Sequence, residues 1–238
     1  MKSHNVSACW RANHTSPNVH VFVIKFANVN GTGSASANGM FAKAIFRMGI
    51  PVSPRNIFPS NIQGLPTWYE VRISQDGYLG RRGGIDMMVS VNPQSFAKDV
   101  GEVEPGGYML YDSTKPLDLR HVRRDIHYLG IPLTEMCLRE YTDSRQRQLF
   151  KNVIYVGALS ALLNIDFSIL KDLVSEQFKG KEKLITPNIH ALEMGHQYAS
   201  THFQCPLGIQ LKAGEQTPKH IQEFDQILMD GNTATALG

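Results

Sequence analysis

Apolar runs alternate with segments of helical periodicity over most of the chain. Short runs rich in β-branched and aromatic side chains, a pattern typical of buried strands, occupy residues 20–29, 67–74, 85–91, 106–113 and 125–131. Residues 35–48 instead repeat apolar side chains at helical spacing and then meet Gly49 and Pro51, which are helix stop signals. Strands that alternate with helices predict an α/β domain with a Rossmann-like, mainly parallel sheet flanked by helices.

The second half of the chain has mostly helical periodicity, so we expect a helical C-terminal half. One helix is expected over residues 146–163, with a stripe formed by Leu149, Val153, Val156, Ser160 and Leu163. Asp166 is placed to cap a second helix that closes at Lys179-Gly180. Thr186-Pro187 is expected to begin a third helix that runs to His202.

Three smaller features complete the expected elements. Asn92 and Pro93 form an N-cap and first-position signature for a short helix. Asp76-Gly77 predicts a turn into a short return strand, and residues 208–212 (GIQLK) form one further possible strand. We therefore expect a flexible extension over residues 1–18, the α/β domain over residues 19–205, and a tail or linker towards a following domain over residues 206–238.

The loop NGTGSASANG (residues 30–39) follows the first strand and precedes the first helix. Gly31 and Gly33 match a GxGxxG dinucleotide fingerprint, but Ser36 holds the third position. The glycines allow positive φ, and a helix N-terminus offers N–H groups to an anion. The loop is therefore a structural turn, a contact for a phosphate or another cofactor, or a nicotinamide or flavin site. Residues 50–54 lack the acidic residue that a ribose requires, which disfavours the last of these readings.

Composition excludes several classes of function. The chain has 238 residues and a formal net charge of +3, without the clustered basic surface of a nucleic-acid-binding protein. The densest basic run, RHVRR at residues 120–124, is expected to be a solvated face. The longest apolar run, residues 154–163, is too short to span a membrane. We expect a cytoplasmic protein with neither nucleic acid nor membrane among its partners.

The thiols and imidazoles do not form an obvious reactive site. Cys9, Cys137 and Cys205 are widely spaced, which predicts neither a disulfide framework nor a four-thiolate iron–sulfur site. Cys137 lies among apolar neighbours and is expected to be a buried structural thiol. His190, His196 and His202 recur every six residues, about 240° apart around a helix, so no metal site is expected from them. We also find no catalytic motif.

Residues 61–70 (NIQGLPTWYE) place polar and aromatic side chains next to a Gly-Leu-Pro turn. We expect this loop to cross the carboxyl end of the sheet, with Gln63, Trp68 and Tyr69 near a ligand or a partner. Exposed aromatic side chains at such a position would favour either kind of contact.

The whole pattern resembles the gamma module of the pyruvate, ketoisovalerate and 2-oxoglutarate:ferredoxin oxidoreductases, over roughly residues 20–205. The segments that carry the resemblance are VIKFANVNGTGSASANGMFAKAIFRMGIPV, NIQGLPTWYEVRIS, IDMMVSVNPQSFAKDVGEVEPGGYMLYDS and RQRQLFKNVIYVGALSALL. NIQGLPTWYEVR is most similar to versions fused ahead of the alpha module, and the tail DGNTATALG resembles the junction with that module.

The resemblance implies an oxidoreductase that is active only as part of a complex. The family reaction is CoA-dependent oxidative decarboxylation of a 2-oxo acid to an acyl-CoA, with electrons passed to ferredoxin. It implies that this module gives subunit packing and part of the CoA region, and that alpha and beta partner modules hold thiamine diphosphate. Iron–sulfur clusters would likewise lie in partner modules, so this chain alone would bind no cofactor.

Under this reading, the residues expected near the CoA co-substrate are Asn30, Gly31, Thr32, Gly33, Ser34 and Gln63. No residue of the chain is expected to be catalytic or to bind a metal. The alternative is a stand-alone CoA- or nucleotide-binding scaffold module without redox activity.

Overall fold

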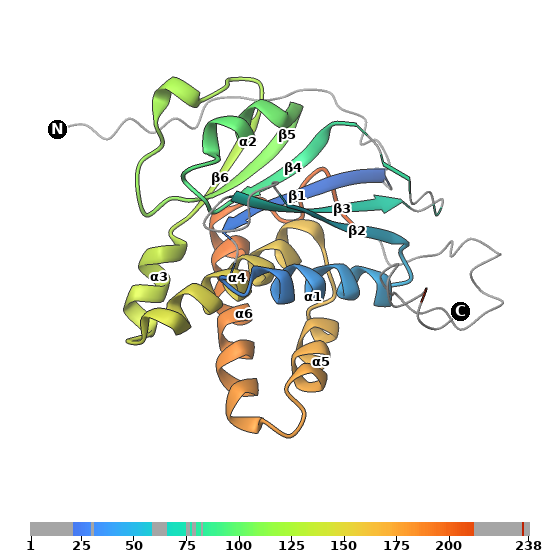
Figure 1. Cartoon of the computed structure of the whole chain (residues 1–238), viewed down its shortest axis with the longest axis vertical. Helices are drawn as coiled ribbons and strands as arrows, with labels where there is room; N and C mark the ends of the chain where they lie inside the picture. The colour runs from blue at the N-terminus through green and yellow to red at the C-terminus, as the bar shows by residue number, and fades with distance from the viewer. Residues whose placement is uncertain are drawn as a thin grey trace.

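The computed structural model describes residues 21–29, 31–58, 66–74, 77, 80–81, 83–211 and 235 (Figure 1). The six strands are β1 (Val21–Val29), β2 (Val52–Ile57), β3 (Pro66–Ser74), β4 (Ile85–Ser90), β5 (Val103–Asp112) and β6 (His127–Ile131). They form one sheet in the order β2-β3-β1-β4-β5-β6. β1, β4, β5 and β6 are parallel, whereas β3 runs antiparallel to both β1 and β2. The expected Rossmann-like, mainly parallel sheet is confirmed.

The helices cover the two faces of the sheet unequally (Figure 1). They are α1 (Ser34–Arg47), α2 (Phe96–Glu102), the short 3₁₀ turn η1 (Leu119–His121), α3 (Leu133–Glu140), α4 (Ser144–Leu163), α5 (Phe167–Gln177) and α6 (Glu182–His202). α1 and α4 lie under one face, with α5 and α6 beyond them, and α2 lies on the other face. The C-terminal half is helical, as expected.

Two apolar clusters follow from this arrangement. The larger one joins the α1 face of the sheet to α1, α4, α5 and α6, and includes Phe26, Phe41 and Tyr155. The smaller one lies under α2 and includes Val23 and Met109. Phe22, Val23, Ile24 and Phe26 are all fully buried, because β1 is a central strand covered on both faces.

Four residues of the stripe expected on α4 are buried (Val153, Val156, Ser160 and Leu163), but the C-terminal half of this helix is buried on every side rather than along one stripe. Every residue from Asn152 to Leu163 is buried, whereas Leu149 is 49% exposed. α4 lies between α1 and α6, so two layers of structure cover it. Gly157 faces the backbone of Leu192, and Gly195 faces the backbone of Ile154, with no room for a Cβ at either glycine. The two helices therefore cross with their backbones in contact.

Two helix starts differ from the expected positions. Asn92 does not cap α2, since its Oδ1 accepts a hydrogen bond from the Gln94 N–H at 3.0 Å within a turn, and the helix begins three residues after Pro93 with Ser95 at its N-cap. α6 begins at Glu182 and includes Pro187 as an interior residue. The buried face of α6 lies after Pro187, and its packing on α4 offsets the hydrogen bond that proline cannot donate.

Three strand expectations also changed. β2 was not anticipated as a strand, because it contains Pro54 and has exposed polar positions, both of which an edge strand tolerates. No strand forms over residues 208–211; the Leu207 and Leu211 N–H groups instead donate to the carbonyls of Leu162 and Leu163, each at 2.8 Å. Between Gly77 and Gly84, the described residues hold no return strand.

Several other expectations lie outside the described residues. They concern residues 1–18, Asp76, Lys212 and nearly all of the last segment. Within the part of the chain that the structure describes, no helix combines the length and the apolar character that a bilayer crossing requires.

The α4–α6 crossing gives a first testable prediction. Gly195→Ala should lower the free energy of unfolding by about 1–3 kcal/mol or more, because a Cβ at this position collides with the backbone of α4. Urea denaturation measures the change. Gly39→Ala in α1 is the matched control, since a Cβ there meets nothing within 4 Å, and it should raise stability by about 0.5–1 kcal/mol. Equal effects of the two substitutions would contradict the tight crossing.

Candidate functional site

A cavity of about 280 Å³ lies where β1 ends and α1 begins. We call it the loop cavity. It is lined by Asn28, Gly31, Gly33, Ser34, Ala35, Asn38, Asn56, Phe58, Thr67, Trp68 and Tyr69. These residues come from the carboxyl end of β1, the first two turns of α1, the end of β2 and the start of β3. In open α/β sheets, this end of the parallel strands is where ligands bind.

The glycines of the loop are required by its backbone conformation. Gly31 and Gly33 have φ values of 82° and 77°, in the left-handed region that favours glycine. Gly33 is also the N-cap of α1, and no side chain caps the helix there. The first turn of α1 therefore begins beside the cavity without the side-chain acceptor that most helices have.

α4 holds this loop in place. The Asn152 Nδ2 donates to the Thr32 carbonyl at 2.8 Å and to the Gln148 carbonyl at 3.1 Å. Asn152 is only 3% exposed. A buried amide of the helix thus fixes the middle of the glycine loop.

A pair of buried polar side chains lies deeper, between α1 and α4. The Tyr155 hydroxyl donates to the Asn38 Oδ1 at 2.6 Å. Tyr155 is fully buried, and this burial raises the pKa of its hydroxyl. The pair is therefore neutral, and it orients the Asn38 amide at the wall of the cavity.

Asn28 is the unusual member of the site. It is 2% exposed, and its side-chain amide lies within hydrogen-bonding reach of the Tyr155 hydroxyl, which lowers the pKa of that hydroxyl against the larger effect of burial. Neither its Nδ2 nor its Oδ1 makes a hydrogen bond of good geometry to a described residue. A buried polar group left unpaired costs about 1–3 kcal/mol. Native structures hold few such groups, and each one calls for an explanation.

The electrostatic character of the loop cavity is neutral. None of its described lining residues is Lys, Arg, Asp or Glu. Burial raises the pKa of Tyr69 to about 12, so its hydroxyl stays protonated at physiological pH. The described part of the lining therefore offers hydrogen-bonding groups without a formal charge.

The structure brings together part of the predicted site. Gly31, Gly33 and Ser34 line the cavity, and Thr32 lies between them, held by Asn152. Asn30 and Gln63 lie outside the described residues. A cofactor-binding role for all six residues stays a prediction.

Sequence reasoning missed the buried polar residues of the cavity. Asn28 interrupts the apolar run VFVIKFANV and was not singled out from sequence. Asn38 was expected to cap α1 or to contact a phosphate; it does not cap the helix, and its side chain instead accepts from Tyr155 at the wall of the cavity. A polar side chain within a buried apolar pattern was the available signal. Tyr155 gave no such signal, because a tyrosine in an apolar helix is common.

Trp68 and Tyr69 line the loop cavity, but Trp68 is not one of the exposed aromatic side chains that would have favoured a ligand or a partner there. This residue lies within β3 and is 9% exposed. Its Nε1 donates to the Asp99 Oδ1 at 2.9 Å, and Ser90 and Ser95 also donate to this carboxylate. Burial raises the pKa of Asp99 even though three donors oppose the rise. This network fixes the strand against α2 and does not form a loop surface.

The order of the strands also bears on the dinucleotide reading. In a dinucleotide-binding Rossmann fold, the ribose is bound at the end of the second strand, which lies next to the first. Here the antiparallel β3 occupies the position next to β1, and β2 lies at the sheet edge. The geometry therefore disfavours a nicotinamide site, in agreement with the missing acidic residue.

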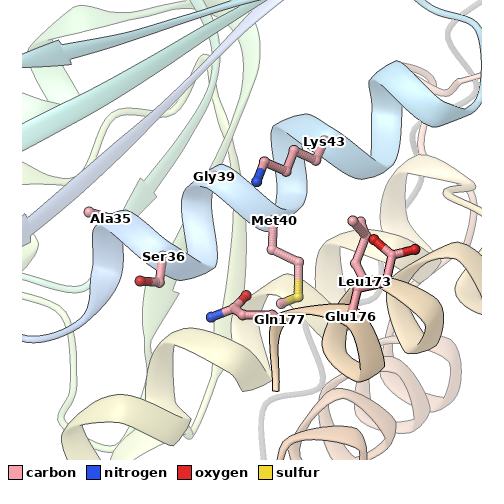
Figure 2. A pocket seen from close by; sticks show the side chains of 8 residues that line it. All are labelled: Ala35, Ser36, Gly39, Met40, Lys43, Leu173, Glu176 and Gln177. Carbon is pink, nitrogen blue, oxygen red and sulfur yellow. The ribbon is translucent and has the colours of Figure 1, made fainter. Parts of the chain in front are cut away.

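A larger groove of about 460 Å³ lies between α1 and α5 (Figure 2). Figure 2 shows Ser36 and Lys43 on α1, across from Glu176 and Gln177 on α5. Arg47 Nη1 donates to the Glu176 carboxylate at 2.9 Å at this exposed edge. The groove has no buried unpaired polar group among its described lining residues. We therefore regard the smaller loop cavity as the stronger candidate site.

The histidines and cysteines have separate environments. His190 pairs with Glu140 at 3.0 Å, His196 contacts Ser160 at 2.8 Å, and His202 contacts the Tyr198 carbonyl at 2.9 Å. Among the described residues, no three His, Cys, Asp or Glu side chains cluster closely enough to hold a metal ion. Cys137 is buried as expected, and burial raises the pKa of its thiol to about 11.

The basic run at residues 120–124 is partly neutralised. Arg120 pairs with Asp118, and Arg123 pairs with Asp125, each at 2.6 Å. Arg123 also donates to the Val100 and Val103 carbonyls, which ties this loop to α2 and β5. Arg120 and Arg123 of this run therefore make contacts within the domain.

Residues 23–198 match the family model described as pyruvate ferredoxin/flavodoxin oxidoreductase. The chain belongs to this family. A 2-oxoacid:ferredoxin oxidoreductase alpha subunit of Aeropyrum pernix is 24% identical over 213 residues, which are 74% of this chain and 33% of the relative. The 2-oxoglutarate synthase subunit KorC of Archaeoglobus fulgidus is 24% identical over 73% of this chain and 88% of the relative.

Solved structures have the same fold. The 2-oxoglutarate:ferredoxin oxidoreductase of Magnetococcus marinus superposes with a TM-score of 0.70 at 23% identity, over 79% of this chain and 33% of that one. A keto/oxoacid ferredoxin oxidoreductase gamma subunit of Geobacter sulfurreducens gives 0.61 at 19% identity, over 76% and 99%. The chain thus spans about a third of the Aeropyrum pernix and Magnetococcus marinus proteins. It spans most of the Archaeoglobus fulgidus and Geobacter sulfurreducens subunits. It has the gamma-type domain of the pyruvate ferredoxin/flavodoxin oxidoreductase family, and the resemblance noted from its motifs is confirmed.

Asn152 allows a test of how the glycine loop is held. Asn152→Ala should speed backbone hydrogen exchange at residues 31–36, because the loop loses its bond to α4. Mass spectrometry of peptides covering the loop reads this out. Asn188→Ala is the matched control, since its Nδ2 donates only within α6, to the Leu184 carbonyl. Unchanged exchange in Asn152→Ala would show that the anchor is not needed.

The carboxyl end of β5 gives a pH-dependent prediction. Burial alone would raise the pKa of Asp112, but hydrogen bonds from Thr114 and Thr134 and the charge of Lys151 outweigh it and lower this pKa. A carboxyl with a lowered folded pKa stabilises the fold above its unfolded value of about 3.9, and this contribution is lost as pH falls through the folded pKa.

Asp112→Asn should therefore cost about 1–3 kcal/mol at pH 7. The gap between variant and native chain should shrink as pH falls below about 4. Urea unfolding across this pH range measures both effects. Asp172→Asn, on the exposed side of α5, should change stability by less than about 0.5 kcal/mol. A gap of constant size at all pH values would contradict the assignment.

Proposed function

We propose that the chain serves as the gamma-type domain of a CoA-dependent 2-oxoacid:ferredoxin oxidoreductase. The assembled enzyme would oxidatively decarboxylate a 2-oxo acid to an acyl-CoA and carbon dioxide, and ferredoxin would accept the electrons. The loop cavity in a domain of this family is the observation that supports the proposal most directly. The similar Magnetococcus marinus enzyme was solved with 2-oxoglutarate, CoA and succinyl-CoA bound.

The residues of this chain fit only part of that chemistry. A four-thiolate iron–sulfur cluster needs four cysteines, and the chain has three, of which Cys137 is buried with a raised pKa. The chain therefore does not fit a cluster of this type. Thiamine diphosphate and the clusters would belong to alpha and beta partner modules, and this domain would contribute subunit packing and part of the CoA region.

Within such an enzyme, the described residues would bind and position rather than react. Gly31 and Gly33 keep the loop free of side chains, so a ligand can approach the backbone. The Asn38 amide is oriented by Tyr155. None of these groups is an acid or base that titrates near neutral pH. A cytoplasmic location and a tail over residues 206–238 that leads towards a following domain remain part of the proposal.

Reconstitution tests the proposal. The full chain should co-purify with thiamine-binding alpha and beta modules when they are expressed together. The complex should reduce a viologen dye or ferredoxin only when both CoA and a 2-oxo acid are present. A preparation that lacks this chain, and a reaction that lacks CoA, are the controls. Equal activity without the chain would contradict the proposed role.

The alternative is a stand-alone CoA- or nucleotide-binding scaffold. The same cavity supports it, because the chain alone forms the described walls. Micromolar binding of CoA or ADP by the isolated chain, together with failure to recover thiamine-binding partners, would favour this alternative. Calorimetry and co-purification on the same preparation separate the two functions.

A further inference from the structure

The two edge strands of the sheet, β2 and β6, differ in how they are protected (Figure 1). An edge strand presents unpaired backbone groups to which another chain can bind. β2 contains Pro54, which has no N–H group and so interrupts this row. β6 has the sequence HYLGI, without proline or lysine, and it pairs with β5 in one continuous register. β6 therefore lacks the usual features that keep a further strand away.

The backbone of β6 turns hydrogen-bonding groups away from the sheet. The Asp125 and Ile131 carbonyls accept hydrogen bonds from N–H groups of β5 and of the residue after it, at 2.6 and 2.9 Å. Backbone groups of successive residues in a strand point to opposite sides, so those of Tyr128 and Gly130 face away from β5. No backbone group among the described residues pairs with these two. A strand added at this edge would find its donors and acceptors in place.

A cavity of about 530 Å³ lies against the same strand, and we call it the edge cavity. Residues 126–129 line one side of it, and residues 202–208, at the end of α6 and beyond, line the other. Its walls include the rings of Tyr108, His127, Tyr128, His202 and Phe203. The volume lies within the roughly 300–1,000 Å³ of ligand pockets. A large apolar side chain of an added strand could therefore enter it, which is how such complexes gain specificity.

The charges around the edge cavity favour an acidic partner. Its described lining contains His127 and His202 but no Asp or Glu. Arg124, just before β6, is exposed and pairs with no described carboxylate. Asp125 already pairs with Arg123 at 2.6 Å. An acidic residue that flanks the added strand would thus meet an unpaired guanidinium.

We propose that β6 docks an extended, acidic segment of a partner module, which adds a strand to the sheet and places an apolar side chain in the edge cavity. The inference rests on the proposed function, since the segment would come from the alpha or beta module of the complex. The edge cavity lies at the start of β6, whereas the loop cavity lies at the carboxyl end of the parallel strands. The docked strand therefore leaves the loop cavity open.

Other occupants fit this edge less well. A small planar molecule would fill the edge cavity but leave the outward backbone groups of Tyr128 and Gly130 unpaired. A second copy of the chain would bring β6 itself, and the sequence HYLGI holds no acidic residue for Arg124. An acidic strand satisfies the backbone, the cavity and the charge together.

Calorimetry with the full chain gives the first test. The probe is a short peptide with blocked ends in which phenylalanine and glutamate alternate, and its control has lysine in place of glutamate. The acidic peptide should bind at least about tenfold more tightly than the basic one. It should slow hydrogen exchange over residues 125–131 and leave the other edge, residues 52–57, unchanged. Equal binding of both peptides would overturn the acidic partner, and unchanged exchange over residues 125–131 would overturn the site.

Matched variants locate the binding surface. Arg124→Glu should weaken binding of the acidic peptide about tenfold, whereas Lys179→Glu, in the turn between α5 and α6 that projects away from the sheet (Figure 1), should change it less than about twofold. Gln204→Trp fills the edge cavity and should also weaken binding about tenfold, whereas Gln197→Trp, outside the cavity, should not. All four side chains are exposed, so the Tm should stay close to that of the native chain. Equal losses within either pair would overturn the site.

The assembled complex provides the second test. Exchange over residues 125–131 should be about tenfold slower or more in the complex than in the chain alone. Gln204→Trp should lower the recovery of partner modules, while the KM for CoA of the recovered complex stays within about twofold. Unchanged exchange over this strand in an active complex would overturn the docking site while the proposed function stands.

The two ideas can fail separately. A native complex without CoA-dependent activity would overturn the proposed function, and the peptide experiments on the chain alone would still decide the docking site. Exchange over residues 125–131 that slows as the concentration of the free chain rises would overturn the partner module as occupant and assign the edge to a second copy.

Discussion

The complete burial of α4 is the constraint on which the rest of the domain depends. From Asn152 to Leu163 this helix has no exposed residue, and it contacts α1, α3 and α6. Because it passes through the middle of the molecule, each of its polar side chains must find a partner at a defined place. Asn152 reaches the glycine loop, Tyr155 reaches α1, and Ser160 contacts His196 of α6.

The carboxyl edge of the sheet is organised from the same helix. Lys151 Nζ donates to the Asp112 carboxylate at 3.1 Å and to the Thr134 hydroxyl at 2.6 Å, so it joins the end of β5 to the start of α3. One residue later, Asn152 holds the loop after β1. Two consecutive residues of α4 thus set the relative positions of two loops that follow parallel strands.

Much of the fold was predictable from sequence, because the buried strands and helices carry clear patterns of apolar side chains. The run VFVIKFANV lies in a central strand, and local periodicity was enough to identify it. β2 was not recognised as a strand, since Pro54 and its polar neighbours read as a loop when the pairing with β3 is unknown. The starts of α2 and α6 were misplaced because cap signals at Asn92 and Thr186 compete with turns and with packing on α4.

Of the candidate site, only the backbone conformation of the glycine loop was predictable from sequence. Gly31 and Gly33 were recognisable because positive φ restricts residue choice. The burial of Asn28 depends on which strand lies beside β1 and on what covers its α1 face, and those are tertiary facts. The local pattern therefore left both a structural turn and a phosphate contact open, whereas none of the described lining residues of the cavity is Lys, Arg, Asp or Glu.

The two backbone bonds from Leu207 and Leu211 to the end of α4 have a consequence for where residues 207–211 lie relative to the loop cavity. They attach the chain after α6 to the last turn of α4, eleven residues beyond the Asn152 anchor. At 1.5 Å per residue this is about 17 Å along the helix. Because one rigid helix carries both anchors, the distance from Leu211 to the glycine loop is set by the length of α4.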